Sequence, residues 1–203
     1  MNLMGYDAMA LGPKELSLGL EVLRQRIVEA EFPMLSANVV LSDSGELLAQ
    51  PYAIKEIAGF RVGIIGLTRV PKNMPAGLQV LNAQEAAVRC VAEVAQEADT
   101  IILLTNVKYN QAVQLVRVLP DVDLLVAALP NQLPNQAVRM PDTKALAVTA
   151  EQPTQGHTGR WVGKLVVTVE SDGSLSLESW QAMSLVKTYA DDLKMAVLLN
   201  SYR

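Results

Sequence analysis

Few residues in this chain have side chains that commonly carry out chemistry. The single histidine, His157, lies in the glycine-bounded segment "TQGHTGRWVG" and could serve as a general base or as a metal ligand. No second histidine, no cysteine and no close carboxylate accompanies it. We therefore expect His157 to be a solvated loop histidine.

The single cysteine and one pair of glycines could also take part in chemistry. Cys90 falls on the apolar face of an expected helix, where a nucleophile and an inert core thiol both fit the sequence. Gly63 and Gly66 lie within a strand-like run, without the third glycine and the following helix of a phosphate-binding loop. We expect these two glycines to serve packing rather than nucleotide binding.

A turn near the start of the chain combines polar residues with glycines. The stretch "GYDAMALGPKELSLG" places Gly12, Pro13, Lys14 and Glu15 between flanking glycines, a punctuation that a plain core segment does not need. Lys14 is the cation of this turn. The pattern raises the question of which ligand such a turn would hold.

The composition favours one folded domain, spanning residues 1–203, with no nucleic-acid partner. Hydrophobic residues make up 50% of the chain, the net charge is −4, and Lys and Arg are scattered, so the attraction that drives nucleic-acid binding is missing. No apolar run approaches the ~18 residues that span a bilayer, and the first residues lack the basic region of a signal peptide. We expect a soluble chain with no membrane partner and leave its compartment open.

The elements that must position these residues alternate between strands and helices. Helical spacing is found at residues 20–30, 83–98, 110–119 and 190–202, and Asn82 resembles the N-cap of the second of these helices. Apolar runs of strand length are found at residues 34–40, 52–57, 60–67, 100–106 and 123–129. The residues Ser171, Asp172 and Gly173 predict a hairpin near the end. The alternation predicts an α/β fold closed by an antiparallel ribbon.

Six segments, taken in order, resemble successive landmarks of the 5′-nucleotidase branch of the calcineurin-like metallophosphoesterases. They are "GYDAMALGPKE", "FPMLSANVV", "GFRVGIIGLT", "ADTIILLTN", "DVDLLVAALPN" and "GRWVGKLVVTVESDG". The resemblance covers nearly the whole chain. It implies a calcineurin-like α/β sandwich of mixed sheets flanked by helices, truncated at its N-terminus relative to the family.

The chain departs from the family pattern at the positions that carry the family's chemistry. The resemblance puts Pro13 in place of a metal-binding Asn and Lys14 in place of the catalytic His. It also puts Asn106, Leu129 and Asn131 in place of metal-binding histidines. The family's first two metal-binding motifs would precede Gly5, and the sequence does not contain them.

These substitutions predict that the chain holds no metal and needs no cofactor. Two divalent cations need several deprotonated oxygen or imidazole ligands. Pro13 and Leu129 have no lone pairs to offer, and an ammonium at Lys14 about 4 Å from a cation costs several kcal/mol at a dielectric constant near 20. We therefore expect a degenerate domain without metal-dependent phosphoesterase activity, which has a binding, scaffolding or interaction role.

Two other functions remain open from the sequence. A small-anion or nucleotide-binding module would use Lys14 and Lys108, with Glu15, Asn106 and Asn131 nearby if the strand ends converge as the resemblance implies. The alternative is that Lys14 binds no ligand and instead pairs with Glu15 or points to water. A phosphoester hydrolase would need residues supplied by an absent N-terminal segment. The expected partner is an unidentified protein or a second copy. If the chain starts at Met1, we expect the open sheet edge either to join two copies or to be covered by the chain's own tail.

Overall fold

A six-stranded mixed sheet forms the centre of the fold, in the strand order β4-β5-β7-β8-β10-β9. The structure is a computed structural model that describes residues 1–203 except residues 108, 128–135, 150–160, 187–188 and 203. The four inner strands run parallel, and β4 and β9 run antiparallel at the edges. The strands are β4 (Tyr52–Ile57), β5 (Phe60–Leu67), β7 (Thr100–Thr105), β8 (Leu124–Ala127), β9 (Val138–Arg139) and β10 (Leu146–Val148).

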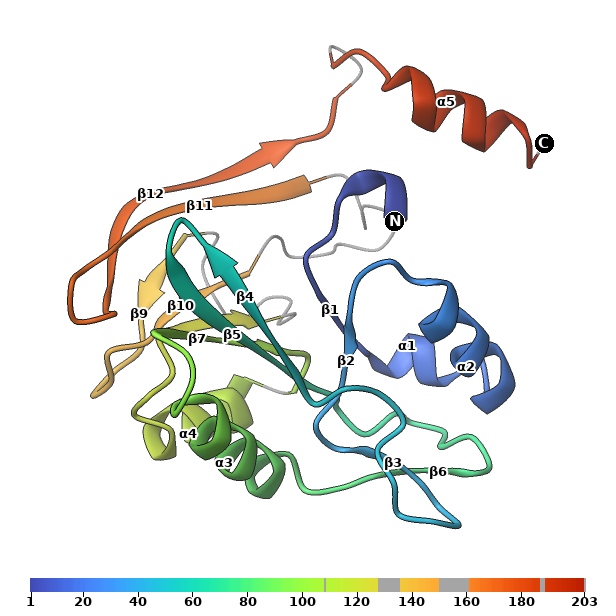
Figure 1. The fold of residues 1–203 in the computed structure, drawn as a ribbon, viewed down its shortest axis with the longest axis horizontal. Helices are drawn as coiled ribbons and strands as arrows, with labels where there is room; N and C mark the ends of the chain where they lie inside the picture. Colours follow the sequence, from blue (N-terminus) through green and yellow to red (C-terminus); the bar gives the residue numbers. More distant parts are fainter. Residues whose placement is uncertain (108, 128–135, 150–160, 187–188, 203) are drawn as a thin grey trace.

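Helices α3 (Ala83–Val94) and α4 (Tyr109–Val118) cover one face of this sheet (Figure 1). The side chain of Asn82 accepts hydrogen bonds from the backbone N–H groups of Gln84 and Glu85, which confirms the predicted N-cap of α3. A Cβ atom at Gly63 would overlap a methyl group of Val94. Gly63 therefore allows α3 to lie directly on β5, in agreement with the predicted packing role.

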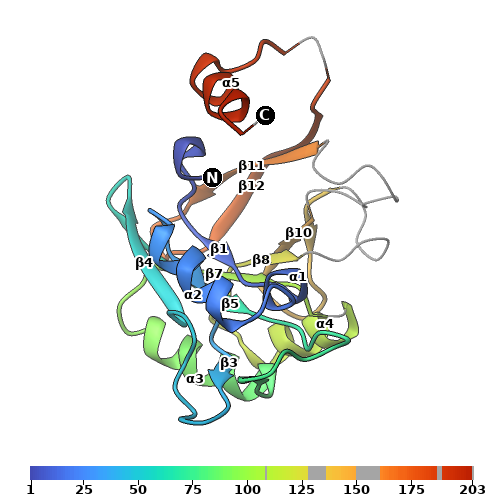
Figure 2. The same ribbon diagram turned by 90° about the vertical axis from the view of Figure 1, so that its right-hand side faces the viewer.

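An antiparallel ribbon covers the opposite face of the sheet, as Figures 1 and 2 show. It consists of β11 (Trp161–Val169) and β12 (Leu175–Ser184), joined by the predicted turn, in which Gly173 has a φ of +81°. Val167 and Trp180 of the ribbon pack against a buried cluster that includes Leu124 of β8 and Leu146 of β10. The ribbon thus closes the α/β layers as the sequence predicts.

The first part of the chain packs beside β5 and β7. It contains a short 3-10 helix, η1 (Asn2–Met4), followed by β1 (Met9–Ala10), α1 (Pro13–Leu16), α2 (Leu20–Glu29), β2 (Met34–Leu35) and β3 (Val39–Leu41). Strand β3 pairs with a later strand, β6 (Leu78–Val80). The prediction of one strand at residues 34–40 is wrong, because β2 pairs with β1 and β3 pairs with β6. The chain changes partner where Ser36 and Asn38 direct their side chains to Thr68.

The predicted C-terminal helix is confirmed as α5 (Leu193–Asn200), but its apolar residues are not buried. Leu193 and Val197 are 82% and 72% exposed, and α5 stands away from the sheet in both views (Figures 1 and 2). In the part of the chain that the structure describes, no helix has the length and apolar character to cross a bilayer.

Candidate functional site

Three strand ends meet beside the start of α1. Leu11 follows β1, Thr68 follows β5 and Asn106 follows β7. The hydroxyl of Thr68 donates a hydrogen bond to the carbonyl oxygen of Leu11 over 2.8 Å, and the amide of Asn106 donates to the same oxygen over 3.1 Å. Because β5 and β7 are parallel neighbours, these side chains lie at the edge of the sheet where α/β folds commonly bind ligands.

The side-chain amide of Asn106 is engaged at both ends. Its Nδ2 donates to the carbonyl oxygen of Leu11, and its Oδ1 accepts from the backbone N–H of Arg69 over 2.6 Å. The side chain therefore joins the residues that follow β1 and β5. These two backbone groups orient the side chain.

The turn at Gly12 is held by a hydrogen bond within the turn. The carboxylate of Glu15 accepts a hydrogen bond from the backbone N–H of Gly12 over 2.9 Å and so caps the start of α1. A Cβ atom at position 12 would lie 2.7 Å from this carboxylate and 3.1 Å from Nδ2 of Asn106. Because Gly12 has no side chain, both Glu15 and Asn106 can lie close to its Cα atom. This close approach explains why a glycine occupies position 12.

A buried polar network supports the strand ends from below. Ser36, Asn38 and Thr68 are 0%, 0% and 1% exposed. The amide of Asn38 accepts from the N–H of Thr68 and donates to its carbonyl oxygen, both over 2.8 Å, while the hydroxyls of Ser36 and Thr68 lie 2.8 Å apart. Sequence reasoning did not identify this network, although two polar residues within the apolar run "MLSANVV" were a signal.

The structure brings together only part of the predicted ligand-binding set. Glu15 and Asn106 lie on either side of Gly12. Lys14 is exposed, and among the described residues its ammonium group has no hydrogen-bond or ion-pair partner, so it points to water rather than pairing with Glu15. Lys108 and Asn131 lie outside the described residues, as do Leu129 and His157.

The remaining chemically reactive side chains form no cluster. Within the described ranges, no group of three or more His, Cys, Asp or Glu residues lies close enough to hold a metal ion. Cys90 is buried on α3, where desolvation, and secondarily the negative charge of Glu93, raise the pKa of its thiol. The raised pKa favours the protonated thiol, which supports the inert core thiol over the nucleophile.

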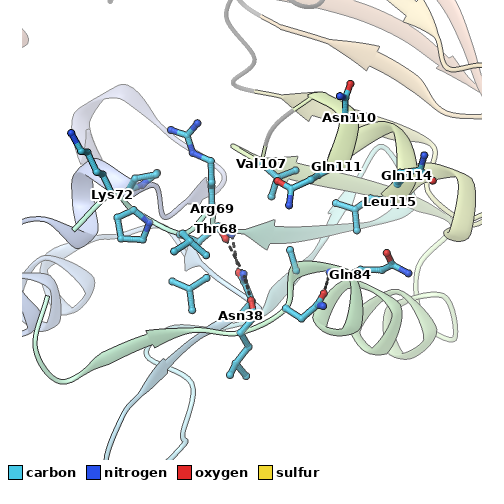
Figure 3. A pocket seen from close by; sticks show the side chains of 17 residues that line it. Asn38, Thr68, Arg69, Lys72, Gln84, Val107, Asn110, Gln111, Gln114 and Leu115 are labelled. Carbon is cyan, nitrogen blue, oxygen red and sulfur yellow. Dashed lines mark hydrogen bonds between the residues drawn. The ribbon is translucent and has the colours of Figure 1, made fainter. Parts of the chain in front are cut away.

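A cleft of about 1030 Å³ opens next to this meeting point (Figure 3). Its walls are the loop that follows β5, the start of α3 and the first turns of α4; Asn38 and Thr68 also line it. Arg69 and Lys72 come from the loop. Sequence reasoning missed both cations, although the segment "TRVPK" follows directly on a predicted strand. Pro13 also lines the cleft, whereas Lys14 does not.

Comparison with known proteins first defines the class of fold. No family model matches the sequence. The calcineurin-like phosphoesterase YfkN of Bacillus subtilis aligns with a TM-score of 0.72 and 22% identity, over 100% of this chain and 70% of its own. At this identity the likeness concerns the fold alone. The chain therefore has the calcineurin-like phosphoesterase fold that the sequence predicts.

Two further comparisons identify the branch within this class. The structure of a 5′-nucleotidase precursor from Thermus thermophilus has a TM-score of 0.76 and 29% identity, over 97% of this chain and 42% of that one. A 5′-nucleotidase from Vibrio cholerae is 36% identical over 120 residues, which cover 55% of this chain and 22% of that protein. These similarities confirm the predicted resemblance to the 5′-nucleotidase branch. The chain spans less than half the length of either relative.

Proposed function

We propose that this 5′-nucleotidase-like chain builds no dinuclear metal centre and acts as a binding domain. The observation that carries the proposal is the position of Asn106. Its Oδ1 and Nδ2 are committed to the N–H of Arg69 and the carbonyl oxygen of Leu11. A side chain that holds two backbone segments in this way cannot turn toward a metal ion without breaking both bonds.

The other donors at this edge of the sheet do not fit a pair of divalent cations either. The resemblance places metal-binding residues at positions 13 and 106 and the catalytic His at position 14, and the side chains there are those of Pro13, Asn106 and Lys14. Proline has no side-chain lone pair, and an ammonium group repels a cation. The Glu15 carboxylate is an anionic donor, but it caps the N–H of Gly12. The residues therefore lack the anionic ligands that make binding of two such ions favourable.

The names of the relatives point to nucleotide hydrolysis by those proteins, and we propose that this chain does not share that activity. In place of catalysis, the same end of the sheet offers an open cleft next to the strand ends. Clefts of this size commonly hold small molecules. A role in binding therefore agrees better with the arrangement of side chains than metal-assisted hydrolysis does.

The test is turnover of AMP and of an aryl phosphate by the purified chain, with Mn²⁺ or Zn²⁺ and with a chelator. The proposal predicts equal, background rates in all conditions. Metal-dependent turnover by the chain alone would contradict it. The alternative is that the chain is part of a hydrolase whose missing ligands come from another segment of a longer protein. This alternative predicts turnover only in the longer protein. Such turnover would also argue against a purely binding role.

A further inference from the structure

The cleft beside the end of β5 is positively charged in an otherwise acidic protein. The chain carries a net charge of −4, yet among the described residues that line the cleft the charged ones are Arg69 and Lys72, with no Asp or Glu. Both side chains are exposed, and within the described part of the chain neither forms an ion pair. Two uncompensated cations on one wall favour an anionic occupant.

The backbone that carries the guanidinium of Arg69 is held in place. The N–H of Arg69 donates to Asn106, and the preceding Thr68 is locked by Asn38 through hydrogen bonds to both its N–H and its carbonyl oxygen. The loop therefore leaves the sheet in a defined direction. A cation on a fixed backbone loses less conformational entropy when it binds a ligand than one on a mobile loop.

The opposite wall offers neutral hydrogen-bonding groups. Figure 3 shows Arg69 and Lys72 on one side of the cleft, with Asn110 and Gln114 of α4 across from them. Amides can donate and accept, so they suit hydroxyl groups. The described residues that line the cleft include no Phe, Tyr or Trp.

From these features we propose that the cleft binds a small hydroxylated oxyanion of the sugar phosphate class. The oxyanion lies against Arg69 and Lys72, and the hydroxyl groups face the amides of α4. Arg69 can contact a phosphate through two parallel N–H groups, and Lys72 adds a point charge. The inference deepens the proposed binding function and rests on it, because it names the ligand class for a chain that does not hydrolyse it.

Two other sources of positive charge contribute little to this cleft. In the first turn of α3, the N–H groups of Gln84 and Glu85 are already capped by the side chain of Asn82, so they are not available to an anion. Lys14, the cation singled out from the sequence, does not line the cleft. Among the described residues, the charge that selects the ligand therefore comes from Arg69 and Lys72.

The experiment is calorimetric titration of the whole chain with glucose 6-phosphate, inorganic phosphate and glucose. We expect glucose 6-phosphate to bind most tightly, inorganic phosphate more weakly and glucose not measurably, with affinity falling as ionic strength rises. Arg69→Ala combined with Lys72→Ala should weaken binding by about tenfold or more. Gln114→Glu, which keeps the shape of the wall but adds a negative charge, should also weaken it.

The matched control is Lys164→Ala combined with Lys194→Ala, which removes the same charge from exposed positions on β11 and α5. This variant and Lys14→Ala should bind as the parent does. No binding of glucose 6-phosphate, or equal losses in the cleft and control variants, would overturn the inference. A loss caused by Lys14→Ala alone would place the anion elsewhere and overturn it too. If the sugar phosphate does not bind, the proposed function is still tested separately, by measurements of turnover and of metal content.

Discussion

The side-chain amide of Asn106 lies between the carbonyl oxygen of Leu11 and the N–H of Arg69, at 3.1 Å and 2.6 Å. Through these two bonds the end of β7 holds the ends of β1 and β5 together. We propose that the same two bonds also keep Asn106 from turning toward a metal ion.

Removing this side chain should destabilise the protein. Asn106→Ala leaves the N–H of Arg69 without its partner and weakens the support of Leu11, so we expect the free energy of unfolding to fall by about 1–2 kcal/mol. Denaturant unfolding measures the change. Asn110→Ala is the control, because Asn110 is an exposed amide on α4, and its loss should change stability by less than about 0.5 kcal/mol. Equal effects at the two positions would show that Asn106 does not clamp the strand ends.

Gly66 should tolerate a methyl group less well than Gly12. A Cβ atom at position 66 would lie 2.6 Å from both the Cβ and the carbonyl oxygen of Leu35, where β5 packs against the backbone of β2. Gly66→Ala should therefore cost about 1–3 kcal/mol of stability. At Gly12 the closest atom belongs to the flexible end of Glu15, so Gly12→Ala should cost clearly less. Thermal unfolding of the two variants gives the order, and the reverse order would contradict this account of the packing.

A buried carboxylate at the start of β8 should also contribute to stability. Asp123 has a side chain that is 2% exposed; its Oδ2 accepts from the N–H of Ile101 over 2.9 Å, and its Oδ1 lies 2.8 Å from Nζ of Lys144. Lys144 is about half exposed, so it can return to water when its partner is removed. We expect Asp123→Ala to cost about 2–3 kcal/mol, mainly through the unpaired N–H of Ile101.

The control for Asp123 is an ion pair on the surface of α2. The carboxylate of Glu21 is 89% exposed and lies 3.8 Å from Arg24, so Glu21→Ala should change stability by less than about 0.5 kcal/mol. Urea unfolding of the two variants makes the comparison. If Asp123→Ala were as mild as Glu21→Ala, the carboxylate would not support β7 and β8.

The thiol of Cys90 should be protected from labelling, and it should make the stability of the protein depend on pH. Burial raises its pKa, so the unfolded chain loses the thiol proton at a lower pH than the folded chain does. The contribution to stability is therefore fully present below the pKa of the unfolded thiol and is lost as the pH rises toward the folded pKa. We expect labelling by a thiol-specific reagent to be about a hundredfold slower in the native protein than in denaturant. Rapid labelling of the native protein would mean that Cys90 is accessible and reactive.

The layers of the fold could be predicted from the sequence because periodicity and turn residues are local signals. Asn82 marks the start of α3, and Gly173 marks the turn between β11 and β12. The break between β2 and β3 could not be predicted, because it depends on bonds from Ser36 and Asn38 to Thr68, about 30 residues further along the chain. Patterns within a window of one helix or strand carry no information about such partners.

Part of the candidate site was predictable for a similar reason. The glycines around Gly12 drew attention to this turn, although the contact of Gly12 with Glu15 and Asn106 was not predicted. Asn106 was singled out through the family resemblance. The role of Asn106 as a clamp depends on the N–H of Arg69, which lies 37 residues away in sequence. The cleft of Arg69 and Lys72 was missed because its walls come from three separate segments, which only the folded chain brings together.

The central claim is that the chain builds no dinuclear metal centre, and its most direct test is the number of metal ions that the purified chain retains. The chain is incubated with excess Mn²⁺ or Zn²⁺, passed through a desalting column and subjected to elemental analysis. Because Pro13, Lys14 and Asn106 supply no anionic ligand, we predict well below one equivalent of either metal per chain. Retention of close to two equivalents would contradict the account.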